Sequence, residues 1–408
     1  MRILYLNPCA EMGGAETSLL ELLASMRAAE PEWSLSLIIG AEGPLVRKAA
    51  ELGVHVVVVP FPFVLAQVGD SASVNFATLV RGFMAAIQYR GQLARAIKAK
   101  RPDLIHSTGF KMHLLSAWSG PKRIPVIWHV HDYVRSRRLM SRLLRWNAGR
   151  CAALIANSRS VAADLQLAVG PKVRIQTIYN AINLERFSPE GHTADLDVLS
   201  GLPPAAPGTI KVGLLATFAW WKGHRTFIKA LSILPENLPI RGYIIGGPIY
   251  QTDGSQHSLA ELREESAQLG LTNRLGFTSF VDNAASALRA LDIVVHASTS
   301  PEPFGMAIIE GMACGKAVIA SQAGGAAEIF TDGVDALGHL PGDAASLSGQ
   351  IARLAQDSDM RMQFGQAGRV RVETAFEKRR LAREVSRLYR HCCGDEQGAP
   401  ADAVVAQH

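Results

Sequence analysis

The stretch from Asp292 to Gly315 reads DIVVHASTSPEPFGMAIIEGMACG and is the most informative part of the chain for fold class. It opens on an apolar run, Asp292–His296, typical of a strand that is buried on both faces. Pro-Glu-Pro at 301–303 ends that strand in a rigid loop, and a helix is predicted to begin near Phe304. Strand, loop and helix in this order form the repeating unit of a parallel α/β sheet.

The same alternation extends from this stretch in both directions. Before residue 190, apolar runs predict strands at Ile3–Leu6, Leu35–Ile39, Val54–Val59, Leu104–His106, Val126–Val130, Ala153–Ala156 and Val173–Ile178. After residue 208, they predict strands at Ile210–Leu215, Gly242–Ile245, Arg274–Phe277, Ile293–His296 and Ala317–Ala320. Helical patterns fill the intervals, so we expect two doubly wound, Rossmann-like α/β domains with right-handed crossovers.

The domain limits follow from a break in this alternation. Residues 191–208 are rich in Gly, Pro, Ser and Asp and predict a linker between domains at 1–190 and 209–376. A basic amphipathic helix at 377–393 is expected to pack back on the first domain, before a disordered tail at 394–408. Because ligands bind at the carboxyl ends of parallel strands, the domains are expected to face each other across a cleft.

Size and composition suit a two-domain protein of the cytoplasm. The chain has 408 residues, 48% of them hydrophobic, and contains no uncharged apolar stretch of about 20 residues that would predict a membrane span. The first residues, MRILYLNPC, fit a buried strand better than a signal peptide. The five cysteines lack metal-ligand spacing and fit reduced thiols.

The charge is distributed unevenly. Residues 1–190 carry 23 Lys and Arg against 13 Asp and Glu, whereas residues 191–408 carry 19 against 23, so the first half is expected to meet an anionic partner. A basic amphipathic helix is predicted near 135–150, with Arg138, Arg142 and Arg145 beside apolar residues at helical spacing. These arginines could contact an anionic membrane surface or a phosphorylated acceptor, or could simply be solvated. No nucleic-acid partner is expected.

Two turns that follow predicted strands suit an anionic ligand. Gly13 and Gly14 precede a predicted helix, whose free N–H groups favour an anion, although an ordinary strand-to-helix turn explains the same residues. The turn lacks the GxGxxG spacing of a dinucleotide site, which argues against NAD. Lys222, in WWKG at 220–223, could set an ammonium against a diphosphate, although a solvated surface lysine is the default interpretation.

Two carboxylates flank the start of the helix that is predicted near residue 304. Glu302 lies in the loop and Glu310 eight positions on, and each can accept paired hydrogen bonds from sugar hydroxyls. The backbone N–H groups of residues 305–307 could bind phosphate. Glu310 could instead be an exposed helix residue, but it is the only charged residue between Glu302 and Lys316.

With these motifs in this order, the sequence resembles the retaining glycosyltransferases of family 4, which have the GT-B fold. The resemblance spans nearly the whole chain and is strongest in the E-x7-E arrangement of Glu302 and Glu310. Its other motifs are MGGAE at 12–16, WHVHD at 128–132, ANS at 156–158, IYNAIN at 178–183, WWKG at 220–223 and GGAAEIFTDGVDALGHLPGD at 324–343.

The resemblance implies a hexosyltransferase that moves a sugar from a UDP- or GDP-sugar to a glycan or lipid-linked acceptor, with retention of configuration. It implies that Glu310 holds the nucleotide ribose, that Glu302 holds the donor sugar and that Lys222 neutralises the diphosphate. His131 would lie beside the reacting sugar. Further donor contacts are implied for Gly13, Gly14, Phe304, Gly305 and Met306. The nucleotide-sugar is a substrate, and the resemblance implies neither a cofactor nor a metal.

The chain departs from the family pattern at one phosphate-binding position. Thr217 stands where the family usually has an arginine, and Arg225 is the candidate to replace it. Two other classes of protein stay open, the second of them because of Thr217 and Ala181. One is a sugar-nucleotide enzyme such as an epimerase on the same fold, and the other is a non-catalytic protein that binds nucleotide-sugars.

Histidines near two strand ends of the first half allow more than one interpretation. His129 and His131 share one strand face and could ligate a metal, but the resemblance explains His131 without one. His106 could line the cleft or could be a buried histidine with satisfied hydrogen bonds.

Overall fold

The computed structural model describes residues 1–67, 76–248, 255–281 and 283–395 of the protein. The chain forms two compact units: unit 1 comprises Met1–Tyr179 with the C-terminal residues from Lys378 onward, and unit 2 comprises Asn180–Glu377. Each unit contains one sheet whose named strand pairs are all parallel, which confirms the predicted doubly wound α/β class. The predicted tail lies outside the described residues from position 396 onward.

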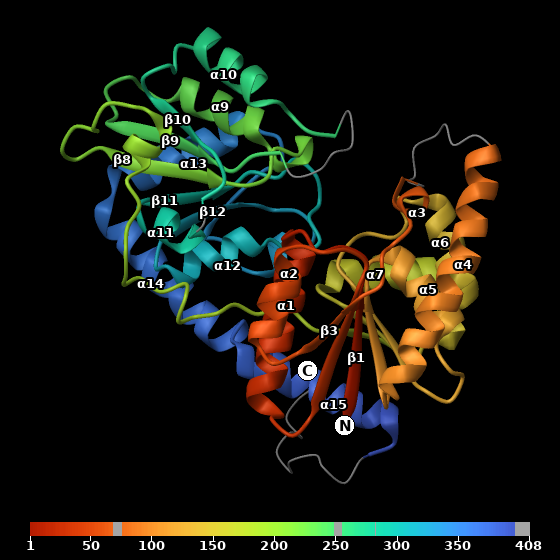
Figure 1. Ribbon diagram of the computed structural model, residues 1–408. Coiled ribbons are helices and arrows are strands. Elements are labelled where there is room, and N and C mark those ends of the chain that lie inside the picture. Colours follow the sequence, from red (N-terminus) through yellow and green to blue (C-terminus); the bar gives the residue numbers. More distant parts are fainter. Residues whose placement is uncertain (68–75, 249–254, 282, 396–408) are drawn as a thin grey trace. The chain divides into compact units, whose positions relative to one another are not determined.

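Unit 1 is built on a seven-stranded sheet in the order β3-β2-β1-β4-β5-β6-β7 (Figure 1). The strands are β1 Arg2–Asn7, β2 Ser34–Ile39, β3 His55–Val58, β4 Leu104–Thr108, β5 Val126–Val130, β6 Ala153–Ala156 and β7 Ile175–Thr177. All seven were predicted from apolar runs, with ends shifted by up to two residues.

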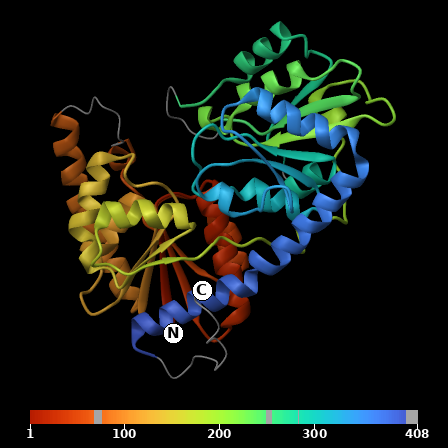
Figure 2. The ribbon, with the colours of Figure 1, turned by 180° about the vertical axis from the view of Figure 1, so that it is seen from behind.

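Helices cover both faces of this sheet (Figures 1 and 2). One layer holds α1 Gly14–Ala29, α2 Pro44–Glu51 and α15 Lys378–Cys393. The other holds α4 Phe76–Lys100, α5 Phe110–Ser119, α6 Arg138–Asn147 and α7 Arg159–Val169, with the short helices α3 Phe63–Gln67 and η1 Ala148–Arg150 beside it. No helix in the described ranges is long and apolar enough to cross a membrane.

The strand side chains of unit 1 alternate between these two layers. Leu4 and Leu6 of β1 join the core cluster that contains Leu93 and Ile97 of α4. Tyr5, between them, faces the opposite layer, where its hydroxyl accepts a hydrogen bond from Tyr389 of α15 at 3.4 Å. Because apolar layers cover both faces of the sheet, residues Ile3–Leu6 of β1 are apolar without alternation.

Helix α15 packs along α1, although nearly the whole chain separates them. The Lys378 ammonium lies 3.0 Å from a carboxylate oxygen of Glu21, and the Arg390 guanidinium lies 2.7 Å from one of Glu30. The buried face of α15 includes Leu381, Val385 and Leu388, which recur at helical spacing. Its basic residues thus form ion pairs on α1 while its apolar face enters the core of unit 1.

Unit 2 is built on a six-stranded sheet in the order β10-β9-β8-β11-β12-β13. The strands are β8 Ile210–Leu215, β9 Ile240–Ile245, β10 Leu275–Thr278, β11 Ile293–His296, β12 Ala317–Ser321 and β13 Leu337–His339. The helices are α8 Leu196–Ser200, η2 Trp220–Lys222, α9 His224–Ile233, α10 Leu259–Gln268, α11 Ala284–Arg289, α12 Met306–Ala313, η3 Gly325–Glu328, α13 Ala344–Gln356 and α14 Ser358–Ala375. One core cluster joins the strands to α9, α10 and α13.

Residues 180–190 belong to unit 2, although the sequence predicted a first domain that extends to residue 190. The backbone of Ile182 pairs with Glu377, and its N–H donates to the Phe376 carbonyl at 3.0 Å. Arg369 of α14 donates to the Phe187 carbonyl at 2.9 Å. These contacts are made by residues far apart in sequence, so local composition does not reveal them.

The predicted linker at 191–208 contains helix α8, which is part of the folded core of unit 2. The carboxylate of Asp195 caps the helix by accepting hydrogen bonds from the backbone N–H groups of Asp197 and Val198, both at 3.1 Å. Gly201, in the left-handed conformation, ends it. The Gly-, Pro- and Asp-rich composition therefore encodes helix caps as well as turns.

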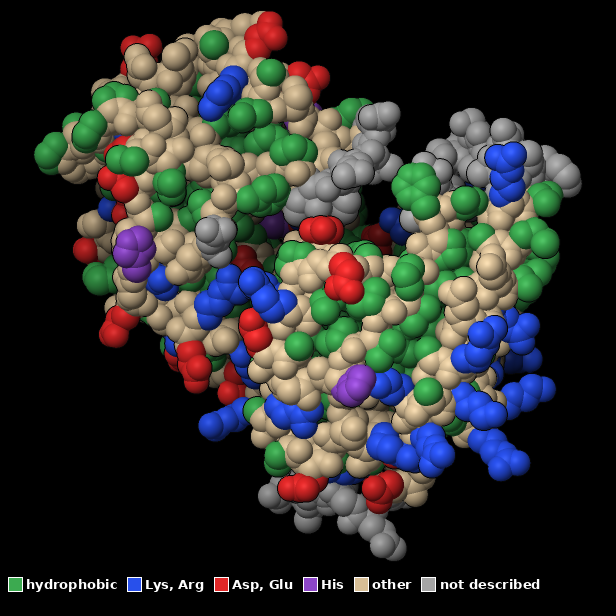
Figure 3. All heavy atoms as spheres, viewed as in Figure 1, with side chains coloured by type: hydrophobic (Ala, Val, Ile, Leu, Met, Phe, Trp, Pro, Cys, Tyr) green, Lys and Arg blue, Asp and Glu red, His purple; other side chains and the backbone are tan. Residues whose placement is uncertain are grey.

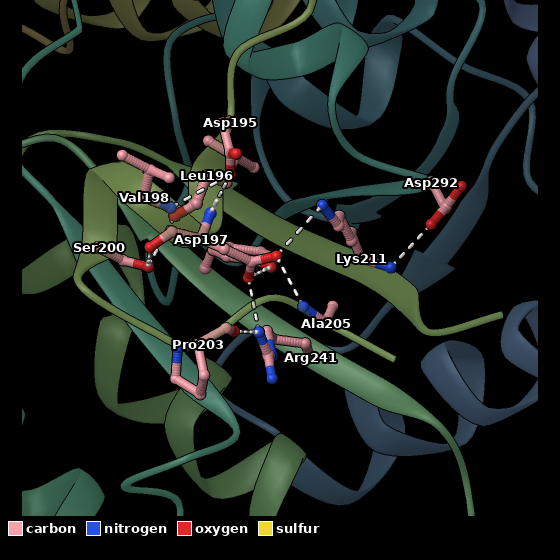
Figure 4. Close-up of polar contacts among 11 residues, drawn as sticks. Asp195, Leu196, Asp197, Val198, Ser200, Pro203, Ala205, Lys211, Arg241 and Asp292 are labelled. Atoms are coloured by element: carbon pink, nitrogen blue, oxygen red, sulfur yellow. Dashed lines mark hydrogen bonds and ion pairs between the residues drawn. The ribbon is translucent and has the colours of Figure 1, made fainter. Parts of the chain in front are cut away.

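Asp197 anchors α8 to the sheet (Figure 4). Its buried carboxylate accepts hydrogen bonds from Arg241 at 2.6 Å, from the Tyr243 hydroxyl at 2.6 Å and from the Ala205 N–H at 3.0 Å. Lys211 of β8 lies 3.7 Å away. Burial raises the pKa of Asp197, but the bonds from Tyr243 and Arg241 outweigh it and lower the pKa to about 2.

Candidate functional site

In unit 2, polar side chains gather where β8 and β11 end. Glu302 lies in the loop after β11, and its carboxylate forms an ion pair with the Lys222 ammonium. The other carboxylate oxygen contacts the His296 ring and accepts a hydrogen bond from the Ser298 hydroxyl at 2.7 Å. The structure thus brings together Lys222 and Glu302, which the sequence singled out, and adds His296 and Ser298.

Gly223 allows the Lys222 turn to approach this loop. It has a φ of +76°, and a Cβ atom at this position would lie 1.8 Å from the Ala297 carbonyl oxygen. Next to it, Thr299 donates its backbone N–H to the Trp221 carbonyl at 2.8 Å. The two turns are therefore joined backbone to backbone, which places the lysine at the carboxylate.

The next strand supports the Glu302 loop from the other side. The Glu302 carbonyl accepts a hydrogen bond from the Gly325 N–H at 2.7 Å. The Ser321 hydroxyl, at the end of β12, donates to the Ser298 carbonyl at 2.7 Å. Loops from β8, β11 and β12 thus hold one carboxylate at the carboxyl edge of the sheet, where α/β proteins bind ligands.

The electrostatics of the cluster keep Glu302 ionised. Its side chain is buried, with a relative exposure of 9% for the residue. Burial by itself would raise the pKa of Glu302, but Lys222 and His296 together hold this pKa well below its usual range. The cluster therefore pairs a buried carboxylate with a half-buried ammonium.

Helix α12 begins at Met306, two residues after the position predicted from sequence. Gly305 forms its N-cap with a φ of +126°, a conformation that favours glycine. The Phe304 ring is buried and packs edge-on against Phe376 at 5.8 Å, so this residue can offer a ligand its backbone. The amides of the first turn of α12 follow directly.

Glu310 lies inside α12 and is 9% exposed. The interpretation of Glu310 as an exposed helix residue is therefore wrong. A carboxylate this deeply buried needs polar partners to offset its desolvation. Of the two methionines near it, Met312 is fully buried, whereas Met306 is half-buried and its sulfur accepts a weak contact from Asn180 at 3.8 Å.

The residues proposed to support phosphate differ in their surroundings. Thr217 is half-buried in the segment after β8, between that strand and the Lys222 turn. Arg225 is in the first turn of α9, and its guanidinium pairs with Glu265 of α10 at 3.1 Å. Trp220 and Trp221 are both exposed.

Sequence reasoning missed His296, Ser298 and His339. His296 and Ser298 were quoted as a strand end and a loop start, but no role was assigned to them. Since they are two positions apart, they point to the same side, which was the available signal. His339 comes from β13 and supports His296, because its Nε2 lies 3.0 Å from the His296 carbonyl oxygen. That contact spans 43 positions in sequence.

In unit 1, Gly13 and Gly14 stand at the start of α1. Gly13 is the N-cap in an extended conformation, and a Cβ atom on Gly14 would have no neighbour within 4 Å. Neither glycine is needed for a left-handed backbone. A Cβ atom on Gly13 would lie 2.9 Å from the carboxylate of Glu16, so the side chain of this first-turn glutamate lies beside the turn.

The histidines of unit 1 form a buried cluster at the ends of β4 and β5. The His129 and His131 rings lie 4.0 Å apart and the His106 and His129 rings 5.2 Å apart, centroid to centroid. The ring nitrogens of His129 and His131 are buried and have no hydrogen-bond partner among the described residues. His106 is a buried core residue, and its Nδ1 lies 2.7 Å from the Tyr389 hydroxyl.

These histidines are neutral at neutral pH. Burial lowers the pKa of His131 to about 4 and, with the nearby His131, lowers the pKa of His106 to about 3. Asp132, next to His131, pairs with Arg137 at 2.9 Å. Within the described ranges, no group of three or more His, Cys, Asp or Glu side chains has the geometry to hold a metal ion.

The predicted basic helix near 135–150 is α6, and Leu144 is its buried anchor. Arg138, Arg142 and Arg145 are all exposed, and none forms an ion pair with a described residue. Trp146, beside them, is 77% exposed. The helix therefore presents both cations and an aromatic ring to its surroundings.

Two family models match successive parts of the chain. Residues 12–186 match Glycosyltransferase Family 4, and residues 204–371 match the glycosyl transferases group 1. In sequence, the chain is 33% identical over 207 residues to D-inositol 3-phosphate glycosyltransferase 2 of Catenulispora acidiphila, a match that covers 47% of this chain and 46% of that protein. The chain thus spans about half the length of this relative.

Other relatives match over a greater length. The chain is 27% identical over 326 residues to the lipopolysaccharide core biosynthesis mannosyltransferase LpsB of Rhizobium meliloti, covering 73% of this chain and 89% of that protein. In structure, Anabaena HepE in complex with UDP-glucose matches with a TM-score of 0.77 at 24% identity, over 95% of this chain and 98% of HepE. Successive parts of this chain are thus similar to glycosyltransferases of family 4 and of group 1, and its two parallel α/β units have the GT-B fold.

Proposed function

We propose that the protein is a retaining hexosyltransferase that moves a sugar from a nucleotide-diphosphate donor to a glycan or lipid-linked acceptor. The observation that carries this proposal is the paired cluster of Lys222 and Glu302 at the carboxyl ends of β8 and β11. It combines a cation for phosphate with a carboxylate for sugar hydroxyls. Helix α12, whose N-terminus follows the Glu302 loop, adds backbone N–H groups.

The chemistry of transfer needs such a cluster. Breaking the anomeric C–O bond builds positive charge on the sugar and negative charge on the leaving diphosphate. An ammonium has three N–H donors, so Lys222 can donate to a phosphate oxygen while it keeps its bond to Glu302. Because Glu302 remains ionised, it can accept paired hydrogen bonds from the hydroxyls of the donor sugar.

We assign the nucleotide to the next part of the same loop and helix. Glu310, two turns into α12, would hold the ribose hydroxyls. The backbone at Phe304, Gly305 and Met306 would bind the diphosphate. Lys222 is then the main phosphate cation, since Arg225 would have to leave Glu265 before it could take the place of the arginine that Thr217 replaces.

In unit 1, we assign His131 to the reacting sugar and Gly13-Gly14 to the donor phosphates. A neutral imidazole has one donor and one acceptor nitrogen, and both nitrogens of His131 lack partners among the described residues. It can therefore hydrogen-bond a sugar hydroxyl without adding a charge. This suits a group that lies beside a sugar developing positive charge.

Two further features support the donor and the place of action. HepE, which shares this fold, has been crystallised with UDP and with UDP-glucose, so uridine diphosphate sugars are the first donors to test. All five cysteines are free thiols, which fits a reducing compartment such as the cytoplasm. The exposed arginines Arg138, Arg142 and Arg145 fit a peripheral place on an anionic membrane.

The test is a panel of UDP-, GDP- and ADP-sugars, scored for binding by calorimetry and for release of the nucleoside diphosphate. One donor should bind, and Glu310→Ala should remove its binding, whereas the exposed Glu236→Ala should leave it unchanged. If no donor binds, or if the Glu310→Ala variant binds the donor as tightly as the wild type does, the assignment of the donor site is wrong. An altered nucleotide-sugar formed without acceptor would favour an epimerase, and binding without any turnover would favour a non-catalytic protein.

A further inference from the structure

We propose that the outer surface of helices α4, α5 and α6 in unit 1 docks on an anionic lipid bilayer, with the exposed apolar side chains of α4 inserted among the lipids. We name this region the α4–α6 surface. Its apolar part is the α4 stripe, defined as Val80, Phe83, Met84 and Ile87. These four positions are spaced by three or four residues, so they lie on one side of the helix.

The first half of α4 is apolar on two opposite sides. Its inner side carries Gly82, which is buried, and Tyr89, which belongs to the same core cluster as Leu93 and Ile97. The stripe is on the other side, and Phe83 and Met84 are each 61% exposed. A helix that is apolar all round is ordinarily buried in a protein core or in a membrane. In this structure the protein core covers only the inner side of α4, and the α4 stripe is exposed.

The charge of the surrounding helices is of one sign. Helices α4, α5 and α6 contain no Asp or Glu in their described spans. Their cations are Arg81, Arg90, Arg95, Lys98, Lys100, Lys111, Arg138, Arg142 and Arg145. Figure 3 shows hydrophobic side chains gathered over α4 at the right of the view, with Lys and Arg side chains below them. This combination matches an interface where acyl chains lie behind anionic headgroups.

Hydrogen bonds join the three helices into one continuous surface. Arg90 of α4, one turn beyond the stripe, donates to the Trp118 carbonyl of α5 at 2.9 Å. The Trp118 indole N–H in turn donates to the Asn147 side chain of α6 at 2.7 Å. Trp146 precedes Asn147 and is exposed, with Arg145 beside it. Tryptophans with one polar contact and one apolar face are characteristic of membrane interfaces.

The other occupants fit this surface less well. A second copy of the same face would bring two sets of cations together with no carboxylate between them, which is unfavourable. Nucleic acid would neutralise the arginines but would leave Phe83, Met84 and Ile87 in water. An anionic bilayer satisfies both the charge and the apolar stripe.

This proposal goes beyond sugar transfer and can be tested apart from it, because vesicle binding needs neither donor nor acceptor. The experiment is co-sedimentation of the full chain with vesicles of phosphatidylcholine, with and without phosphatidylglycerol. The wild type should bind only the anionic vesicles. Replacing Phe83, Met84 and Ile87 by Ser together should lower its partition coefficient at least about tenfold. Replacing Arg138, Arg142 and Arg145 by Gln should remove the preference for phosphatidylglycerol.

The matched control removes exposed apolar side chains from the other unit. Met362→Ser with Val370→Ser, on α14, should leave vesicle binding unchanged. Thermal unfolding and donor binding of each variant report whether the fold is retained. The proposal is overturned if the triple serine variant sediments like the wild type or if neutral vesicles bind equally well. It is also overturned if the serine substitutions convert a dimer into a monomer while the wild type binds no vesicles.

Discussion

The two candidate regions handle buried polar groups in opposite ways. In unit 2, Glu302 is ionised and contacts Lys222, His296 and Ser298. In unit 1, the rings of His129 and His131 are neutral, and their nitrogens have no partner among the described residues. In the first region the carboxylate is paired and the Nδ1 atom of His296 lacks a partner among the described residues, whereas in the second region both ring nitrogens of His129 and of His131 lack one.

This difference bears on how each region can act. A paired ion cluster is held in position by its own contacts, so a ligand finds its charges already oriented. Unpartnered imidazoles carry a desolvation cost that a ligand hydroxyl could offset by bonding to them. We therefore expect substitutions in unit 2 to alter charge stabilisation and substitutions in unit 1 to alter hydrogen bonding alone.

Removing the cation of the paired cluster should have the largest effect. Lys222→Ala is expected to lower the transfer rate by about 1,000-fold, equivalent to about 4 kcal/mol, because the leaving diphosphate loses its ammonium. It also leaves Glu302 buried without its main counter-ion, so the pKa of Glu302 should rise. Transfer is measured as UDP release with acceptor present. Lys229→Ala, an exposed lysine on α9, is the control and should retain full activity.

Asp197 is also a paired carboxylate, but it lies outside the candidate site. Its substitution therefore tests whether an ion pair of this kind contributes to stability without contributing to activity. Asp197→Asn should lower the free energy of unfolding by about 3 kcal/mol, because Arg241 is left beside a neutral group in a buried site. The wild-type contribution is present above the unfolded pKa near 4 and is lost as the pH falls towards the folded value of about 2. Urea unfolding of unit 2 at neutral pH measures the effect.

The matched control for Asp197 is Asp359→Asn, an exposed carboxylate at the start of α14. It should change the free energy of unfolding by well under 1 kcal/mol. Transfer activity per folded molecule should be normal in both variants. A loss of turnover in folded Asp197→Asn would mean that this ion pair also supports the donor site.

Glu302 and Asp197 also show which functional contacts can be predicted from sequence and which cannot. Glu302 could be singled out because its loop and helix are contiguous in the chain and follow a recognisable strand. The role of Asp197 was missed, since Arg241 lies 44 positions away and the surrounding Gly and Pro residues indicate a linker. Contacts within one strand–loop–helix unit are encoded locally, whereas contacts between strands are set by sheet order.

The same limit applies to the histidines and to α4. His106 was left open between a cleft residue and a core residue, and its partner Tyr389 comes from the last helix of the chain. A helix was expected between the strands predicted at 54–59 and 104–106, but neither the bounds of α4 nor its exposed apolar side was predicted. Apolar residues on two sides of α4 obscure the single apolar face that identifies an ordinary amphipathic helix. In both cases, the missing knowledge is which side chains become buried when distant parts of the chain pack against them.

In unit 1, removing the imidazole of His131 should have a moderate effect. His131→Ala is expected to lower the transfer rate by about 100-fold, because one hydrogen bond to the reacting sugar is lost while the diphosphate contacts remain. Donor binding should change far less than the rate, which kcat and the dissociation constant measure separately. His55→Ala, an exposed histidine of the same unit, is the control. Equal losses in binding and rate would place His131 in nucleotide binding instead.

The smallest predicted effect is a change in the pH dependence of stability. Burial holds the pKa of His129 well below that of a free imidazole, so the unfolded chain takes up a proton that the folded chain does not. The stability of wild-type unit 1 is then complete above about pH 6.5 and falls as the pH drops below it, by up to about 1.4 kcal/mol per pH unit for each such histidine. His129→Phe keeps a ring and removes no hydrogen bond to a described residue, since both nitrogens lack partners there. It should flatten this slope by about one histidine's share, whereas the exposed His192→Gln should leave it unchanged. If His129→Phe unfolds with the wild-type slope, the ring is protonated or paired in the folded state, and the contrast between the two regions fails.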